Sequence, residues 1–243
     1  MAAVKQADRY HVYVWEFPVR LFHWVNFLCL MVLGVSGYLI GSPPALGSAS
    51  DASQQYWFGT VRFLHFGTAY LWVCIAVVRL YWGFAGNEYV RFRNFLPLRR
   101  EQWQEIGAVL RVDVLQTYKG ATFSVGHNPL AGIAYSLGFV AFLFMTVTGF
   151  GLYSAMSPSG WPKLFAWIVP LLGGDHTVRV WHHAGLWFFV VFSLVHVYLS
   201  AYHDYVEATG TISSMIGGWK FLRRGPQPSQ APRTERAGGG SGL

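Results

Sequence analysis

The feature that most constrains the fold of this sequence is an apolar segment, residues 181–205, that carries four histidines. It reads WHHAGLWFFVVFSLVHVYLSAYHDY and is long enough to cross a lipid bilayer as a helix. Ionisable side chains are costly inside a membrane, so these histidines are candidates for a function. On a helix, His182 and His196 lie within about 40° of each other and about 21 Å apart along the axis, whereas His183 faces another way. The spacing therefore indicates one helix face with an imidazole near each membrane surface.

The composition places the whole chain among membrane proteins. Its 243 residues are 53% hydrophobic and 18% aromatic, and only 12% are charged. Apolar segments of membrane-crossing length predict four spans, at about residues 21–40, 63–82, 129–153 and 180–202. We therefore expect an all-α integral membrane protein, a four-helix transmembrane bundle in one domain over residues 1–222. Residues 223–243 are expected to form a basic, flexible tail, because they end in the linker-like GGGSGL.

Basic residues are distributed unevenly between the two sides of the predicted membrane. Four spans place both termini on one side, which collects Lys5, Arg9 and Arg20, six basic residues between the second and third spans, and five in the tail. The opposite side has only Arg62, Lys163 and Arg179. The positive-inside rule then predicts that both termini are cytoplasmic. The net charge of +7 thus indicates orientation in a membrane and gives no reason to expect nucleic-acid binding.

The cysteines and the first apolar segment exclude several classes of protein. Cys29 and Cys74 both lie in apolar runs, where cysteine behaves as a small hydrophobe. Two cysteines are too few to ligate an iron–sulfur cluster. The absence of a C-x-x-C-H motif excludes covalent c-type haem attachment. The first apolar segment lacks a small-residue cleavage site, so we interpret it as a retained span and not as a signal peptide.

Two connections have helical or apolar character without spanning. Within residues 83–128, apolar side chains at helical spacing predict a short helix on the membrane surface: Trp103, Ile106, Leu110 and Val114. The run FAWIVPLL, in the connection before the fourth span, is too short to cross and is expected at the interface.

The predicted topology pairs the histidines by depth. His65 and His182 begin their spans on the external side, whereas His23 begins the first span on the cytoplasmic side and His196 lies towards that side. Two neutral imidazoles that face each other across a porphyrin are the axial ligands of many b-type haems. The pattern therefore predicts two haems b per chain, with the four histidines as axial ligands of the irons. Zinc fits less well, because it prefers three or four ligands at one point.

Other residues have two explanations each. Gly34 follows His23 by eleven residues, and Gly138 and Gly149 show the same spacing, as expected where helices pass the rim of a porphyrin. Ordinary small-residue helix packing explains them equally well. Arg79, near the end of the second span, is either an anchor that reaches the membrane surface or the partner of a haem propionate.

Short segments run in the same order as in a known family over most of the chain, from residue 10 to about 222. They are YVWEFPVRLFHWVN (13–26), GYLIGSPP (37–44), RFLHFGTAY (62–70), RLYWGFAGNEY (79–89), GHNPLAG (126–132), TGFGLYS (148–154), WHHAGLW (181–187), HVY (196–198) and TISSMIGGWK (211–220). With the paired histidines, these segments resemble the b-type cytochrome subunit of membrane-bound nickel–iron hydrogenases. The wider group includes the cytochrome subunit of respiratory formate dehydrogenase.

The resemblance implies an electron-transfer subunit in the bacterial cytoplasmic (inner) membrane, and not the subunit that splits hydrogen. It implies that the haem of His65 and His182 is the proximal one. This haem would take electrons from iron–sulfur clusters of the hydrogenase small subunit, which is docked with the large subunit on the periplasmic side. The distal haem, held by His23 and His196, would pass electrons to membrane quinone.

The likeness to formate dehydrogenase implies a quinone site at the loop before the third span, near His127 and Asn128. The Asn128 amide would bond a quinone carbonyl, and His127 would exchange protons. A turn that only starts the helix is an equal explanation. His183 and His203 depart from the family pattern and receive no role.

Two alternative functions stay open at this stage. The same histidines would serve a stand-alone di-haem cytochrome b that oxidises quinol, or the cytochrome subunit of another respiratory dehydrogenase such as formate dehydrogenase. In a membrane anchor or scaffold, by contrast, the histidine pairs would only pack the bundle. The absence of a stable partner on purification would favour the stand-alone cytochrome, and the absence of a b-type absorption band would mean that the chain has no redox role.

Overall fold

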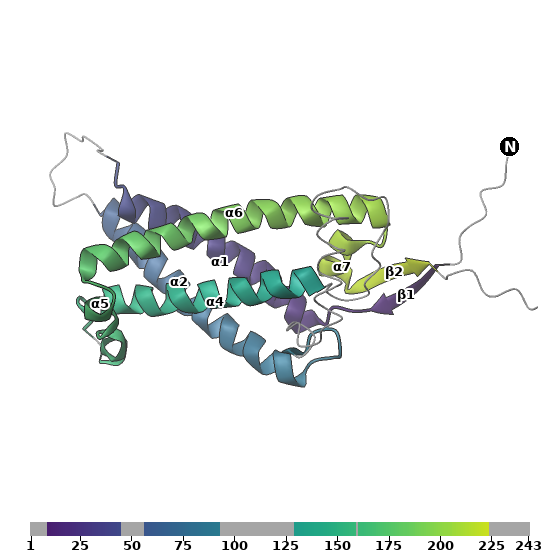
Figure 1. Ribbon diagram of the computed structural model, residues 1–243, viewed down its shortest axis with the longest axis horizontal. Coiled ribbons are helices and arrows are strands. Elements are labelled where there is room, and N and C mark those ends of the chain that lie inside the picture. The colour runs from purple at the N-terminus through teal and green to yellow at the C-terminus, as the bar shows by residue number, and fades with distance from the viewer. Residues whose placement is uncertain (1–8, 45–55, 93–128, 159, 224–243) are drawn as a thin grey trace, which may run out of the picture.

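The computed structural model describes residues 9–44, 56–92, 129–158 and 160–223. Among them are four helices long and apolar enough to cross a membrane, which confirms the predicted four-helix membrane bundle. They are α1 (Phe17–Gly41), α2 (Trp57–Ala85), α4 (Pro129–Ser154) and α6 (Asp175–Glu207). The helices run along the long axis of the molecule (Figure 1). Contacts are most extensive between α1 and α2, and α6 packs against α4 and α1.

The helices contain the predicted spans and extend beyond them, most clearly at the starts of α2 and α6. α6 begins at Asp175, whose carboxylate accepts a hydrogen bond from Arg179 Nε at 2.6 Å, one helical turn later. Charged residues fall outside an apolar window, yet an i,i+4 pair of this kind supports a helix. His65 and His182 therefore lie about two turns inside their helices, on rigid backbone rather than at helix ends.

The outward faces of the helices are apolar. Leu28, Val35, Val77 and Leu194 are each at least 60% exposed, and they come from three of the four long helices. Water-soluble proteins rarely expose continuous apolar surface of this extent. The faces are suited to lipid, in agreement with the composition.

The start of α1 is tied to the end of α2. Glu16, the N-cap residue of α1, accepts hydrogen bonds from Trp82 Nε1 at 2.9 Å and from the backbone amide of Asn87 at 3.0 Å. Pro18 lies in the first turn, where its missing amide proton is not needed. One carboxylate thus fixes where α1 begins relative to α2.

A two-stranded sheet joins the two ends of the described chain, and the sequence analysis did not predict it. β1 (Arg9–Tyr13) pairs antiparallel with β2 (Trp219–Arg223), next to the short helix α7 (Thr211–Gly217). The amides of Val14 and Trp15 continue the pairing by donating to the carbonyl of Gly218 at 2.9 and 3.1 Å. Figure 1 shows this terminal cap, defined as β1, β2 and α7, at one end of the bundle.

The opposite end of the bundle carries two short helical segments, η4 (Trp161–Phe165) and α5 (Ile168–Leu171). They contain most of the FAWIVPLL run, which forms turns packed against α4 and does not cross the bundle. The Trp161 ring lies 4.6 Å from that of Phe150, between ring centres. The predicted surface helix at residues 103–114 lies outside the described residues.

We predict that Gly218→Ala destabilises the terminal cap. Gly218 has a φ of +89°, and a β-carbon there would lie 2.8 Å from the carbonyl oxygen of Trp15. The left-handed backbone alone costs an alanine about 1–2 kcal/mol. Thermal unfolding in detergent, followed by tryptophan fluorescence, should show a midpoint about 4 °C lower.

The matched control is Gly217→Ala, because a β-carbon at Gly217 meets nothing within 4 Å. Equal midpoints for the two variants would contradict the importance of the Gly218 conformation.

Candidate functional site

The structure brings four of the predicted site histidines together in two pairs. Near the end that carries α5, His65 of α2 faces His182 of α6, with ring centres 6.5 Å apart. Near the terminal cap, His23 of α1 faces His196 of α6, with ring centres 6.2 Å apart. We call these the outer pair and the inner pair.

The two pairs are separated along the bundle. His182 and His196 are fourteen residues apart on one continuous helix, which corresponds to about 21 Å. They lie at different depths on the same face of α6, which runs the length of the molecule (Figure 1). α6 therefore contributes one imidazole to each pair, and α1 and α2 contribute the others.

Each imidazole of the outer pair contacts a hydroxyl group on a further helix. His65 Nδ1 lies 2.9 Å from Ser36 Oγ of α1. His182 Nδ1 lies 2.9 Å from Thr148 Oγ1 of α4. All four long helices thus contribute a residue to the outer pair or to its hydroxyl contacts, and each ring turns its Nδ1 edge towards its hydroxyl.

Glycines allow the outer pair to approach the neighbouring helices. A β-carbon at Gly37 would lie 3.2 Å from Cε1 of His65, and one at Gly149 would lie 3.1 Å from Cε1 of His182. Both distances are tight for a side chain, so each glycine leaves room for an imidazole. Gly149 was selected from the sequence by its spacing; Gly37, next to Ser36, was missed.

The other predicted glycines pack against apolar side chains. A β-carbon at Gly34 would lie 3.5 Å from Leu186 Cδ1, and one at Gly138 would lie 3.9 Å from Phe192 Cζ. Both distances are ordinary van der Waals contacts. Contacts of this kind are those of ordinary helix packing.

Side chains of three long helices, α2, α4 and α6, meet in an aromatic layer, defined as Trp72, Phe142 and Phe189. The Trp72 ring centre lies 4.7 Å from that of Phe142 and 5.7 Å from that of Phe189. Trp72 Nε1 donates a 2.6 Å hydrogen bond to Asn26 Oδ1 of α1. Phe189 is seven residues from each ligand candidate of α6, so the layer lies about halfway between the two pairs.

The inner pair has aromatic neighbours. The His196 ring is parallel to that of Phe192, at 6.1 Å between centres, and the His23 ring meets Trp24 edge-on at 5.2 Å. Within the described residues, the buried His23 Nδ1 has no hydrogen-bond partner. An uncompensated polar atom of this kind is typical of a binding site.

The residues of both pairs fit b-type haem. Because a metal–imidazole bond is about 2 Å long, two imidazoles on opposite sides of one iron have ring centres about 6 Å apart. The observed 6.5 and 6.2 Å agree with this value. In the described part of the chain, no group of three or more histidine, cysteine, aspartate or glutamate side chains is arranged to hold a metal ion. A two-imidazole site suits a porphyrin, which supplies the other four ligands itself.

Arg79 is buried, with 5% of its surface exposed. Its Nη2 donates to the carbonyl of Val90 at 3.3 Å, and its guanidinium lies 5.3 Å from the ring centre of Tyr135. This burial contradicts the interpretation of Arg79 as an anchor that reaches the membrane surface.

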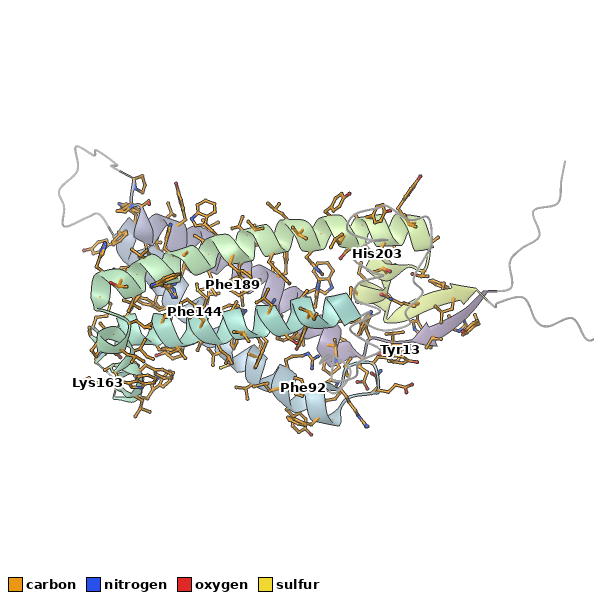
Figure 2. The ribbon with its side chains drawn as sticks, viewed as in Figure 1. Tyr13, Phe92, Phe144, Lys163, Phe189 and His203 are labelled. Carbon is orange, nitrogen blue, oxygen red and sulfur yellow. The ribbon has the colours of Figure 1, made fainter. Side chains whose placement is uncertain are left out.

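His183 and His203 belong to neither of the two pairs. His183 lies beside Gly41 and 6.3 Å from the ring of Tyr38, and His203 meets Tyr202 edge-on at 6.0 Å. Figure 2 labels His203 near the end of α6 that lies by the terminal cap. His127 and Asn128 lie outside the described residues.

Known proteins resemble this chain over nearly its whole described length. The family model described as prokaryotic cytochrome b561 matches residues 14–218. A probable Ni/Fe-hydrogenase B-type cytochrome subunit of Azotobacter chroococcum mcd 1 is 41% identical over 217 residues, which cover 87% of this chain and 89% of that protein. The protein of the same name from Cupriavidus necator is 41% identical over 215 residues, 87% of each chain. A probable Ni/Fe-hydrogenase 1 B-type cytochrome subunit of Escherichia coli strain K12 is 34% identical over 219 residues, 88% of this chain and 92% of that one.

We predict that Gly149→Val lowers the haem content of the purified protein. A valine side chain has no room beside His182, so it would push the imidazole out of the outer pair. The haem-to-protein ratio, measured as the pyridine haemochrome, should fall while the protein still inserts into membranes.

Gly67→Val of α2 is the control, because a β-carbon at Gly67 meets nothing within 4 Å. Equal haem content in the two variants would show that the close approach at Gly149 is unimportant.

Proposed function

This chain belongs to the prokaryotic cytochrome b561 family, and we propose that it is the membrane-bound electron-transfer subunit of a Ni/Fe-hydrogenase. The observation that carries the proposal is the pair of two-histidine sites at two depths along α6, His182 in one and His196 in the other. The names of relatives at 34–41% identity over most of the chain support the hydrogenase as partner. Such a subunit also anchors the hydrogenase to the membrane.

We assign two b-type haems to the chain, one to each pair. Haem b, when bound, supplies one-electron redox chemistry at its iron. His65 and His182 would hold the outer haem, and His23 and His196 the inner one. The protein's part is to hold four neutral imidazoles on rigid helices in an apolar bundle. The aromatic layer lies about halfway between the two pairs.

The orientation of the subunit follows from its charges. The excess of lysine and arginine at the terminal-cap side supports a cytoplasmic location for both termini in the inner membrane. The outer pair then faces the periplasm, where it would receive electrons from the iron–sulfur small subunit, to which the large subunit is bound. The inner pair would deliver them to membrane quinone at the cytoplasmic side.

The quinone is assigned to the loop before α4. Asn128 would donate a hydrogen bond to a quinone carbonyl, and His127 would exchange protons with the quinone. Arg79 is a candidate partner for a propionate of the inner haem, because it is a buried cation near the inner end of α2. Pairing with a carboxylate would offset the cost of burying its charge.

The alternative functions would use the same histidine pairs. A stand-alone quinol oxidase or a formate dehydrogenase cytochrome would also bind two haems in this bundle. The shared names of the relatives favour the hydrogenase partner over both. Purification of the tagged chain from its native membranes distinguishes the three functions. A hydrogenase, a formate dehydrogenase or no partner should co-purify, according to which function is correct.

We predict that the purified chain shows a b-type band in its reduced-minus-oxidised spectrum, with two haems per chain. His182→Ala should remove the outer haem and retain the inner one, and His23→Ala should do the reverse. Each substitution deletes one axial ligand, and the pairs lie about 21 Å apart on α6.

His183→Ala is the matched control, since its imidazole is adjacent in sequence but belongs to neither pair. A chain without a b-type band, or equal haem loss from His183→Ala and His182→Ala, would refute the assignment.

We predict that Asn128→Ala slows quinone reduction about fivefold without changing haem content. The loss corresponds to one hydrogen bond of about 1 kcal/mol. Steady-state assays of hydrogen-dependent reduction of a soluble quinone analogue measure it in the intact complex. Unchanged quinone kinetics with both haems bound would end the assignment of Asn128.

A further inference from the structure

The two imidazoles of the outer pair share one local arrangement. Ser36 and Gly37 on α1 meet His65, and Thr148 and Gly149 on α4 meet His182. In each case a hydroxyl lies 2.9 Å from Nδ1, and the glycine that follows it faces Cε1 of the same ring. Two separate helices thus present the same hydroxyl–glycine step to the two rings.

The hydroxyl protons in this arrangement are already used. Ser36 Oγ donates at 2.5 Å, and Thr148 Oγ1 at 2.7 Å, to the carbonyl four residues earlier in its own helix. A hydroxyl has one proton and two acceptor lone pairs. Each Nδ1 contact therefore needs a proton from the imidazole, with Nδ1–H donating to the hydroxyl oxygen. That tautomer leaves the lone pair on Nε2, the atom a metal would bind.

We infer that Ser36 and Thr148 are positioning residues of the outer haem, which fix the tautomer and orientation of both axial ligands and raise the donor strength of Nε2. The inference rests on the proposed function in one respect, that a haem binds between His65 and His182. Hydrogen bonds from the non-ligating nitrogen of a metal-bound histidine act in this way in general. A stronger donor stabilises ferric iron more than ferrous iron, so the two hydroxyls lower the midpoint potential of the outer haem.

The inner pair provides a reference within the same molecule. Among the described residues, the buried Nδ1 of His23 has no hydrogen-bond partner, and the ring of His196 lies against the rings of Phe192 and His23. The effect of the hydroxyls is therefore confined to one of two haems held by the same bundle.

Ser136 shows what a hydroxyl does without an imidazole. Its Oγ donates to the carbonyl of Gly132 at 2.9 Å, the same bond one turn back in α4. A helix carbonyl alone thus satisfies a serine in this apolar bundle. The additional contacts of Ser36 and Thr148 with histidine are not needed to bury a hydroxyl, which supports a role in holding the rings.

The test is a redox titration of the full-length, haem-loaded chain as wild type, Ser36→Ala, Thr148→Val, Thr148→Ser and Ser136→Ala. Optical spectra give the midpoint potential of each haem, and electron paramagnetic resonance of the ferric state reports the axial ligand field. Removing a hydroxyl should raise the ratio of reduced to oxidised outer haem about tenfold at a fixed potential. For a one-electron couple this is a shift of about 59 mV.

The inference predicts a positive shift for Ser36→Ala and Thr148→Val in the outer haem only, with Thr148→Ser and Ser136→Ala close to wild type. If Thr148→Val loses the outer haem, retention by Thr148→Ser supports the hydroxyl, and loss from both variants overturns it. Unchanged potentials and resonance spectra, or equal shifts in both haems, also overturn it. Wild-type protein without two haems would instead refute the proposed function, so the two failures are distinguishable.

Discussion

The constraint on which this structure depends is the cost of a polar group inside a membrane. Burying an imidazole among apolar helices is costly unless it finds a partner, because lipid offers none. The outer pair finds one on each ring, through the hydroxyls of Ser36 and Thr148, and turns the other ring nitrogen away from them. The glycines beside these hydroxyls let the helices come close enough for those bonds. The same hydroxyl and glycine residues thus satisfy the imidazoles, let the helices approach and orient the candidate ligands.

α6 connects the two sites, because it contributes one histidine to each of them. A spacing of seven residues returns a helix almost to the same face, and His182, Phe189 and His196 follow this spacing. The same face therefore presents a ligand candidate, an aromatic ring and a second ligand candidate along the membrane normal. Trp72 and Phe142 complete the middle level from α2 and α4, and the bond of Trp72 to Asn26 fixes its indole. The continuous helix between the two sites keeps their separation constant.

Features that rest on long apolar segments or on helical spacing were predictable from the sequence. Features that depend on residues far apart in the chain were not. Four apolar segments gave four helices, and the depth of each histidine within its span predicted which rings meet. Charged helix ends, such as that formed by Asp175 and Arg179, were missed because an apolar window stops before them. The pairing of β1 with β2 joins segments at opposite ends of the chain, and neither has a local signal for it. The burial of Arg79 likewise depends on Val90 and Tyr135, which no spacing connects to it.

The missed sheet has a consequence for the inner pair. Trp24, the neighbour of His23, donates to the carbonyl of Met215 at 2.9 Å, and Arg20 donates to the carbonyl of Ile216. Both acceptors belong to α7, which β2 holds against the start of α1 through β1. The start of α1 is thus fixed from the far end of the chain. The outer pair contacts hydroxyls on α1 and α4, whereas the start of the helix that carries His23 is bonded to the terminal cap, so the two sites depend on different parts of the sequence.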